Sequence, residues 1–193
     1  MNAGELLKRY REGQRDFNHI NLSKAKLIKI ELILTELNRA SFQGSDLSGA
    51  ILVGASLHQA NLVKAKLTQA NLIGAELIKA DLRQADLQYA ILSGANFQGA
   101  DLSGANLRGA SLTGADLTGA NLQGTNLEGA NLQGARLAIA NLRNANLNRA
   151  DLRDVDFDGA TMPDGSKQKS SVAPEKKPTK LAGPIKRQVT TRR

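Results

Sequence analysis

The stretch ANLQGTNLEGANLQGA, residues 120–135, repeats a small residue, asparagine, leucine, a variable residue and glycine with a period of five. The same period extends from Phe17 to Met162, where every fifth residue is leucine, phenylalanine or methionine, at thirty positions without insertion or deletion. The residue two places before is alanine at twenty-three of these positions, and the residue between is mostly asparagine or aspartate. A register of this length leaves no room for a conventional domain of helices and loops.

A period of five fits neither regular secondary structure. On an α-helix a step of five turns by about 140°, so the leucines would spiral around every face. In a straight strand an odd step sends successive leucines to opposite faces. The remaining solution is a bend in every repeat, with the alanine and leucine on the inner face of a short extended piece. If each bend is near 90°, four repeats close a square coil of about twenty residues, and such coils stack at roughly 4.8 Å.

A coil of twenty residues has independent support in the charges. At intervals of twenty, the residues that precede leucine alternate in sign, as stacked neighbours should: Lys26, Asp46, Lys66 and Asp86. Thirty repeats then predict an all-β solenoid of about seven and a half coils, in which each coil buries its apolar surface against its neighbours.

The stretch ADLSGANLRGASLTGADLTGANLQG, residues 100–124, resembles the bacterial pentapeptide-repeat family, whose signature is A-[D/N]-L-x-x. The resemblance covers about residues 16–165 and implies a right-handed quadrilateral β-helix. It implies almost nothing about function. Arg15, Ile20 and Ile30 replace the small residue at the start, so we expect an irregular first coil.

Two further segments flank the repeat, which gives three regions: 1–15, 16–165 and 166–193. Residues 2–13 place Leu6, Leu7 and Tyr10 at helical spacing, which predicts a short N-terminal α-helix. We expect this helix to cap the solenoid, because an open end invites end-to-end stacking; a partner-binding helix is the alternative. After a turn at residues 163–165, the composition of residues 166–193 cannot build a core and predicts a disordered tail.

The positive charge of the protein lies in this tail. Residues 166–193 carry nine basic residues and one glutamate, which equals the whole-chain net charge of +8 and leaves residues 1–165 neutral. The tail is therefore a candidate electrostatic tether to nucleic acid or an anionic membrane, and a solubilising tail is the alternative. It has no aromatic residue for base stacking, so we expect no sequence-specific recognition. The candidate tether residues are Lys167, Lys169, Lys176, Lys177, Lys180, Lys186, Arg187, Arg192 and Arg193.

The sequence offers no catalytic constellation. Cysteine is absent, and His19 and His58, the two histidines, fall at outward turn positions. No nucleophile, phosphate-loop, dinucleotide or metal-ligand motif is present, so we expect no enzyme activity, cofactor, metal or small-molecule substrate. One outward column of polar residues could hold a cation, although hydrogen bonding to neighbouring backbone or water is favoured: Asn61, Asp81, Asp101, Asn121 and Asn141. Without a secretory signal or a membrane span, the expected compartment is the cytoplasm.

The expected function is that of a non-enzymatic structural or protein–protein interaction module, with an unidentified protein or a second copy as partner. Two alternatives remain. Some members of the family mimic B-form DNA and bind type II topoisomerases, a role that needs a strongly acidic rod, whereas this rod is neutral. The other alternative is tethering through the tail.

The candidate interface is a contiguous apolar stripe on the N-terminal half of one face, where a coil of four repeats would align outward apolar residues. The alternatives are that β-branched residues favour stacked strands, or that the N-terminal helix folds over part of the stripe. The stripe consists of Ile33, Leu34, Ile51, Val53, Ile73 and Ile91.

Overall fold

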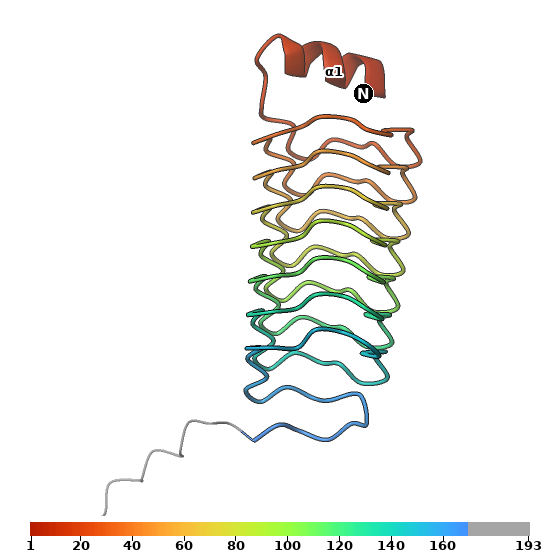
Figure 1. Ribbon diagram of the computed structural model, residues 1–193. Coiled ribbons are helices and arrows are strands. Elements are labelled where there is room, and N and C mark those ends of the chain that lie inside the picture. Colours follow the sequence, from red (N-terminus) through yellow and green to blue (C-terminus); the bar gives the residue numbers. More distant parts are fainter. Residues whose placement is uncertain (170–193) are drawn as a thin grey trace, which may run out of the picture.

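The chain forms a stack of four-sided coils with one helix, α1 (Ala3–Arg11), across its N-terminal end (Figure 1). The structure is a computed structural model and describes residues 1–169. Asn2 caps α1, since its Oδ1 accepts the N–H of Glu5 at 2.9 Å. Gly13, just beyond the helix, adopts a φ of 94°.

Residues twenty apart lie directly above one another. Parallel bridges join Asp16 to Glu36 and continue in steps of five residues to the bridge between Asn141 and Thr161. Each extended piece contributes a single bridged residue, because a turn takes up the two residues that follow the leucine. An antiparallel bridge between Thr161 and Lys167 ends the series. The coil therefore contains four repeats, and the four charged residues that alternate in sign are stacked.

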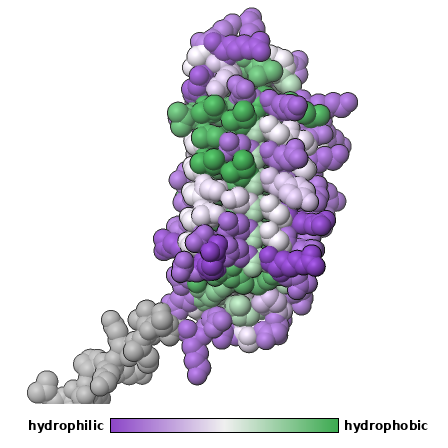
Figure 2. Space-filling model, in the orientation of Figure 1, coloured by the Kyte–Doolittle hydropathy of each residue, from purple (hydrophilic) through white to green (hydrophobic). Residues whose placement is uncertain are grey.

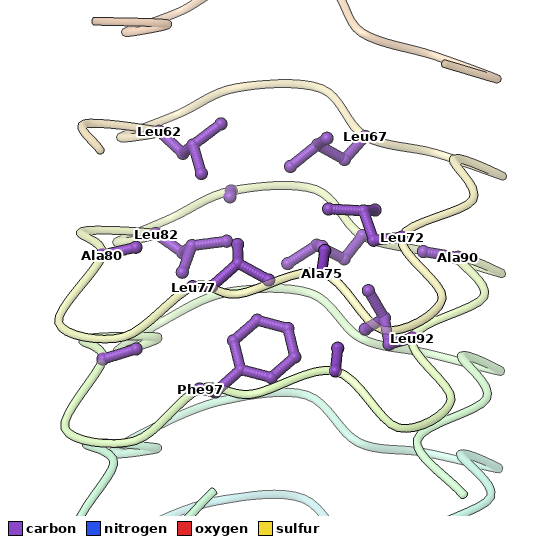
Figure 3. Packing of buried hydrophobic residues seen from close by; sticks show 14 of the residues in the cluster. Leu62, Leu67, Leu72, Ala75, Leu77, Ala80, Leu82, Ala90, Leu92 and Phe97 are labelled. Atoms are coloured by element: carbon purple, nitrogen blue, oxygen red, sulfur yellow. The ribbon is translucent and has the colours of Figure 1, made fainter. Parts of the chain in front are cut away.

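The core is the axis of the stack. Leucine side chains enter it from all four faces, as Leu67, Leu72, Leu77 and Leu82 do in Figure 3, and each of these is fully buried. The alanines beside them are buried where the chain turns. Three alanine positions hold a buried hydroxyl instead, and each hydroxyl donates to a backbone carbonyl oxygen at 2.7–2.8 Å: Thr35, Ser45 and Thr125.

A β-turn begins at each inward leucine or phenylalanine, and from His19 to Gly159 the residue two places after it, the third of the turn, has a positive φ. This conformation at the third position of a β-turn is the mark of a type II turn and favours glycine there. Glycine holds the position at every turn from Gly94 to Gly134, but fifteen turns use another residue. Among these fifteen residues Ile139, with a φ of 54°, is the β-branched one. A β-branched side chain clashes with the backbone in this region, so the strain is greatest there. The turn geometry is therefore imposed by the stack even where the residue opposes it.

The asparagines and aspartates that precede many of the inward leucines accept hydrogen bonds from neighbouring backbone, as favoured for the polar column from Asn61 to Asn141. In the repeat 61–65, three N–H groups donate to carbonyl oxygens of adjacent coils, and that of Ala65 closes the turn on Leu62 at 3.0 Å. The remaining N–H, that of Val63, donates to Oδ1 of Asn61 at 3.1 Å. The same bond recurs along the stack, for example between Ser103 and Asp101 at 2.9 Å. The Asp/Asn side chain thus satisfies the turn N–H that no coil can reach.

The expectation of an irregular first coil was wrong. Its bridges are those of the later coils, and His19 and Lys24 have the same positive φ as later turn residues. Larger residues fit here because no coil precedes them; Ile30 is buried among the residues under α1. Arg15 joins the two parts, since its guanidinium donates to the carbonyl oxygen of Tyr10 at 2.8 Å and lies 4.1 Å from the centre of the Tyr10 ring.

A substitution pair tests the assignment of inward and outward positions. Leu102 is fully buried, so Leu102→Ala leaves a cavity and should cost about 2–5 kcal/mol of unfolding free energy. Gln123 is exposed, and Gln123→Ala should stay within about 0.5 kcal/mol. Thermal unfolding followed by circular dichroism measures both. Equal shifts in melting temperature for the two variants would contradict the assignment.

Several of the aspartates that precede an inward leucine and accept a turn N–H have lowered pKa values. The Ser48 hydroxyl donates to Asp46 at 2.6 Å and, together with the Ser48 N–H, lowers the pKa of that carboxyl. The Arg83 guanidinium, which donates to Asp81 at 2.6 Å, lowers the pKa of Asp81. A carboxyl whose pKa is lower in the folded state stabilises the fold above its unfolded pKa and loses that contribution as the pH falls through the folded value.

The melting temperature should therefore be nearly constant from pH 7 to about 5 and fall below about pH 4. The double variant Asp46→Asn/Asp81→Asn keeps the acceptors for the turn N–H groups but removes two titrating carboxyls. Its melting temperature should fall less over the same range. A wild-type melting temperature that is unchanged down to about pH 2 would show that these carboxylates contribute nothing.

Candidate interaction surface

The stripe occupies one face of the coil near its N-terminal end, where residues 31–34, 51–54, 71–74 and 91–94 stack. Ile73 and Ile91 are 42% and 41% exposed, and Leu34 is 68% exposed. Ile51 and Val53 are half-buried. Figure 2 shows that apolar side chains gather toward the α1 end of the rod. The structure thus aligns the six predicted residues on one side of the stack.

Two of these residues stand where the turn normally has its acceptor. Among the thirty residues that directly precede the inward leucine, phenylalanine or methionine, Ile51 and Ile91 are the two apolar ones, and both fall on this face. An isoleucine side chain cannot accept the N–H of the residue two places on, as Asn71 does for Ile73 at 3.1 Å. Both positions therefore give up a hydrogen bond worth about 0.5–1.5 kcal/mol in exchange for exposed apolar surface.

The C-terminal end of α1 contacts the stripe at the turn that contains Ile33 and Leu34. The phenol oxygen of Tyr10 accepts the N–H of Ile33 at 3.2 Å, in a repeat whose residue before the inward leucine is Glu31. Tyr10 thus supplies the acceptor that Asp or Asn provides in other repeats. Leu34, the next residue, lies over Gly54 of the following coil and remains the most exposed member of the stripe. α1 therefore contacts one end of the stripe and leaves Leu34 uncovered.

A groove of about 400 Å³ lies beside the stripe, between α1 and the first coil. Leu7 and Arg11 of α1 line one side, and Lys26, Ile28 and Lys29 line the other. The sequence marks Ile28 as an apolar residue at an outward position, but its partner across the groove depends on where the helix packs. Sequence reasoning missed this site for that reason.

Three of the five residues of the polar column predicted on another face are linked to one another by hydrogen bonds. Oδ1 of Asp101 accepts from the Asn121 amide at 3.1 Å, and Oδ1 of Asn121 accepts from the Asn141 amide at 3.3 Å. These oxygens also accept the turn N–H groups. The side chains of Asp101, Asn121 and Asn141 therefore link three successive coils.

Both histidines lie on one face at outward turn positions, as predicted. They line a shallow depression of about 350 Å³ together with Asn38 and Arg39. Nε2 of His58 lies 3.8 Å from a carboxylate oxygen of Glu76. His19 has a positive φ of 61° and is exposed.

The candidate tether falls largely beyond the part of the chain that the structure describes. Lys167 and Lys169 are exposed at the C-terminal end of the stack. The other seven residues lie outside the described residues: Lys176, Lys177, Lys180, Lys186, Arg187, Arg192 and Arg193. Within residues 1–169, no helix has the length and apolar character needed to cross a membrane.

Comparison with solved structures gives proteins of the same repeat type. HetL from the cyanobacterium Nostoc sp. strain PCC 7120, a pentapeptide-repeat protein involved in heterocyst differentiation regulation, is 33% identical over 87% of this chain and 100% of its own, with a TM-score of 0.43. QnrB1, a plasmid-mediated fluoroquinolone resistance protein, is 18% identical over 76% of this chain and 74% of its own, with a TM-score of 0.59. A comparison with curated protein sequences gives no match.

The family model for pentapeptide repeats matches residues 16–54, 50–88, 90–129 and 125–162. These segments span the whole stack of coils, whose fold is the right-handed quadrilateral β-helix of the matched structures. The chain belongs to the pentapeptide-repeat family.

Proposed function

We propose that this chain is a non-enzymatic protein–protein interaction module whose contact surface is the stripe. In this proposal residues 16–165 form a rod of about seven and a half coils, residues 1–15 cap its N-terminal end, and residues 166–193 are a basic tail. Pentapeptide-repeat proteins are structural or interaction modules, so the family supports the general class. The specific surface is argued from this chain's own residues.

The observation that carries the proposal is the placement of Ile51 and Ile91. Apolar residues replace the turn acceptor at these two positions, and both lie on the face that also exposes Ile33 and Ile73. The turn itself does not explain the choice, because Asp or Asn at the same position would add a hydrogen bond. Contiguous exposed apolar surface is typical of a binding site.

The charge of the rod argues against the alternative of DNA mimicry. Residues 1–165 contain equal numbers of basic and acidic residues, and a neutral surface cannot reproduce the dense negative charge of a DNA duplex. The fluoroquinolone-resistance role in QnrB1's description belongs to a protein 18% identical to this one. It supports the shared fold and carries no function over to this chain.

Restoring the missing acceptors separates binding from folding. In Ile51→Asn/Ile91→Asn, each new amide should accept a turn N–H and add up to about 1 kcal/mol to the free energy of unfolding. The melting temperature should therefore stay the same or rise. Thermal unfolding measures this. A clear loss of stability would mean that the isoleucines serve the fold and would remove the main support for the proposal.

A second copy is the simplest partner for an exposed stripe. Analytical ultracentrifugation should show the full-length chain in a concentration-dependent monomer–dimer equilibrium. Val53→Ser/Ile73→Ser should shift the chain to monomer without lowering its melting temperature by more than a few degrees, since neither side chain enters the core. Val63→Ser/Gln123→Ser, with outward substitutions on a different face, is the control. A wild-type chain that remains monomeric at every concentration would contradict self-association.

A further inference from the structure

The groove between α1 and the first coil combines apolar walls with positive charge. Leu7 and Ile28 face it from opposite sides, and Ile28 is 55% exposed. Arg11, Lys26 and Lys29 line the same space, against Glu31 as the acidic lining residue. The groove has the volume of a small-ligand or side-chain pocket.

The cations of the groove are poorly neutralised by the protein itself. In the described residues, neither Arg11 nor Lys29 forms a salt bridge, whereas the neighbouring Lys8 and Arg9 pair with Glu12 and Glu5 within α1. Lys26 acts on Asp46 of the next coil, where it helps to lower the pKa of that carboxyl. The charge that faces the groove is therefore complementary to an acidic ligand.

The walls of the groove are held in place before any ligand arrives. The Tyr10 hydroxyl accepts the N–H of Ile33, and the Arg15 guanidinium donates to the carbonyl oxygen of Tyr10. These bonds fix the C-terminal end of α1 to the first coil of the rod. The stem of Lys29 packs over Gly49 of the next coil. A preformed site loses less entropy on binding than one that must be ordered.

We propose that this groove binds an acidic segment of a partner protein, with one bulky apolar side chain between Leu7 and Ile28 and flanking carboxylates at Arg11, Lys26 and Lys29. This extends the proposed function, on which it rests only in that the rod binds protein, to a second surface. A nucleic acid is disfavoured, because the Tyr10 ring, the aromatic side chain at the site, is already covered by Arg15 and cannot stack on a base. The chain's own segment 166–193 is also disfavoured as the ligand, because its net charge is positive like that of the groove.

The test uses a phage-displayed library of random dodecapeptides selected on the immobilised full-length chain. Enriched peptides should contain aspartate or glutamate on both sides of a leucine, isoleucine or phenylalanine. The binding of the synthesised peptides to the full-length chain is then measured by fluorescence anisotropy. Lys29→Glu and Ile28→Ser should each weaken binding by at least about tenfold.

Matched controls come from the repeat itself. Lys79 has the same positive-φ turn position as Lys29 and packs over Gly99 in the same way, and Ile78 corresponds to Ile28. Lys79→Glu and Ile78→Ser should leave affinity unchanged, and so should Val53→Ser/Ile73→Ser, which tests the stripe separately. The proposal is overturned if no peptide is enriched, if the enriched peptides lack acidic residues, or if Lys29→Glu and Lys79→Glu bind alike.

Discussion

The bend that follows each inward leucine is the constraint on which the whole structure depends. It brings the next alanine–leucine pair to the axis, and it requires a positive φ at one residue in every five. Two devices hold it: glycine where strain must be absent, and an Asp or Asn side chain that accepts the N–H at the centre of the turn. Where neither device is present, stacking against the coils above and below imposes the geometry, as at Ile139.

The repeat predicted most of the fold because a period of five excludes the alternatives. The inward residues and the twenty-residue coil follow from the spacing of leucine and alanine, and the bridges have that period. The tolerance of the first coil for Ile20 and Ile30 did not follow, because it depends on what lies beyond the end of the stack. That the Asn and Asp side chains bond to neighbouring backbone was expected from their polar character, but the pattern did not say that the N–H they accept is the one at the centre of the turn.

For the candidate surfaces the sequence was sufficient in one case and insufficient in the other. The stripe lies within regular coils, so arithmetic on residue numbers brings Val53 and Ile73 together. The groove joins α1 to a coil through packing that has no period, and no spacing rule relates Leu7 to Ile28. Sequence reasoning therefore reaches a surface built from repeats and does not reach one built between a repeat and a unique segment.

The four-sided coil also limits how such a rod changes length in evolution. Gain or loss of one repeat leaves the axis filled and the turns intact, yet it rotates everything downstream by a quarter turn. One extra repeat between Ile51 and Ile91 would move Ile91 to the adjacent face and split the stripe, although the fold would be preserved. Only insertions and deletions of whole coils keep a surface in phase. A lineage that depends on one face should therefore vary in steps of four repeats, and a lineage that depends only on the rod should vary in steps of one.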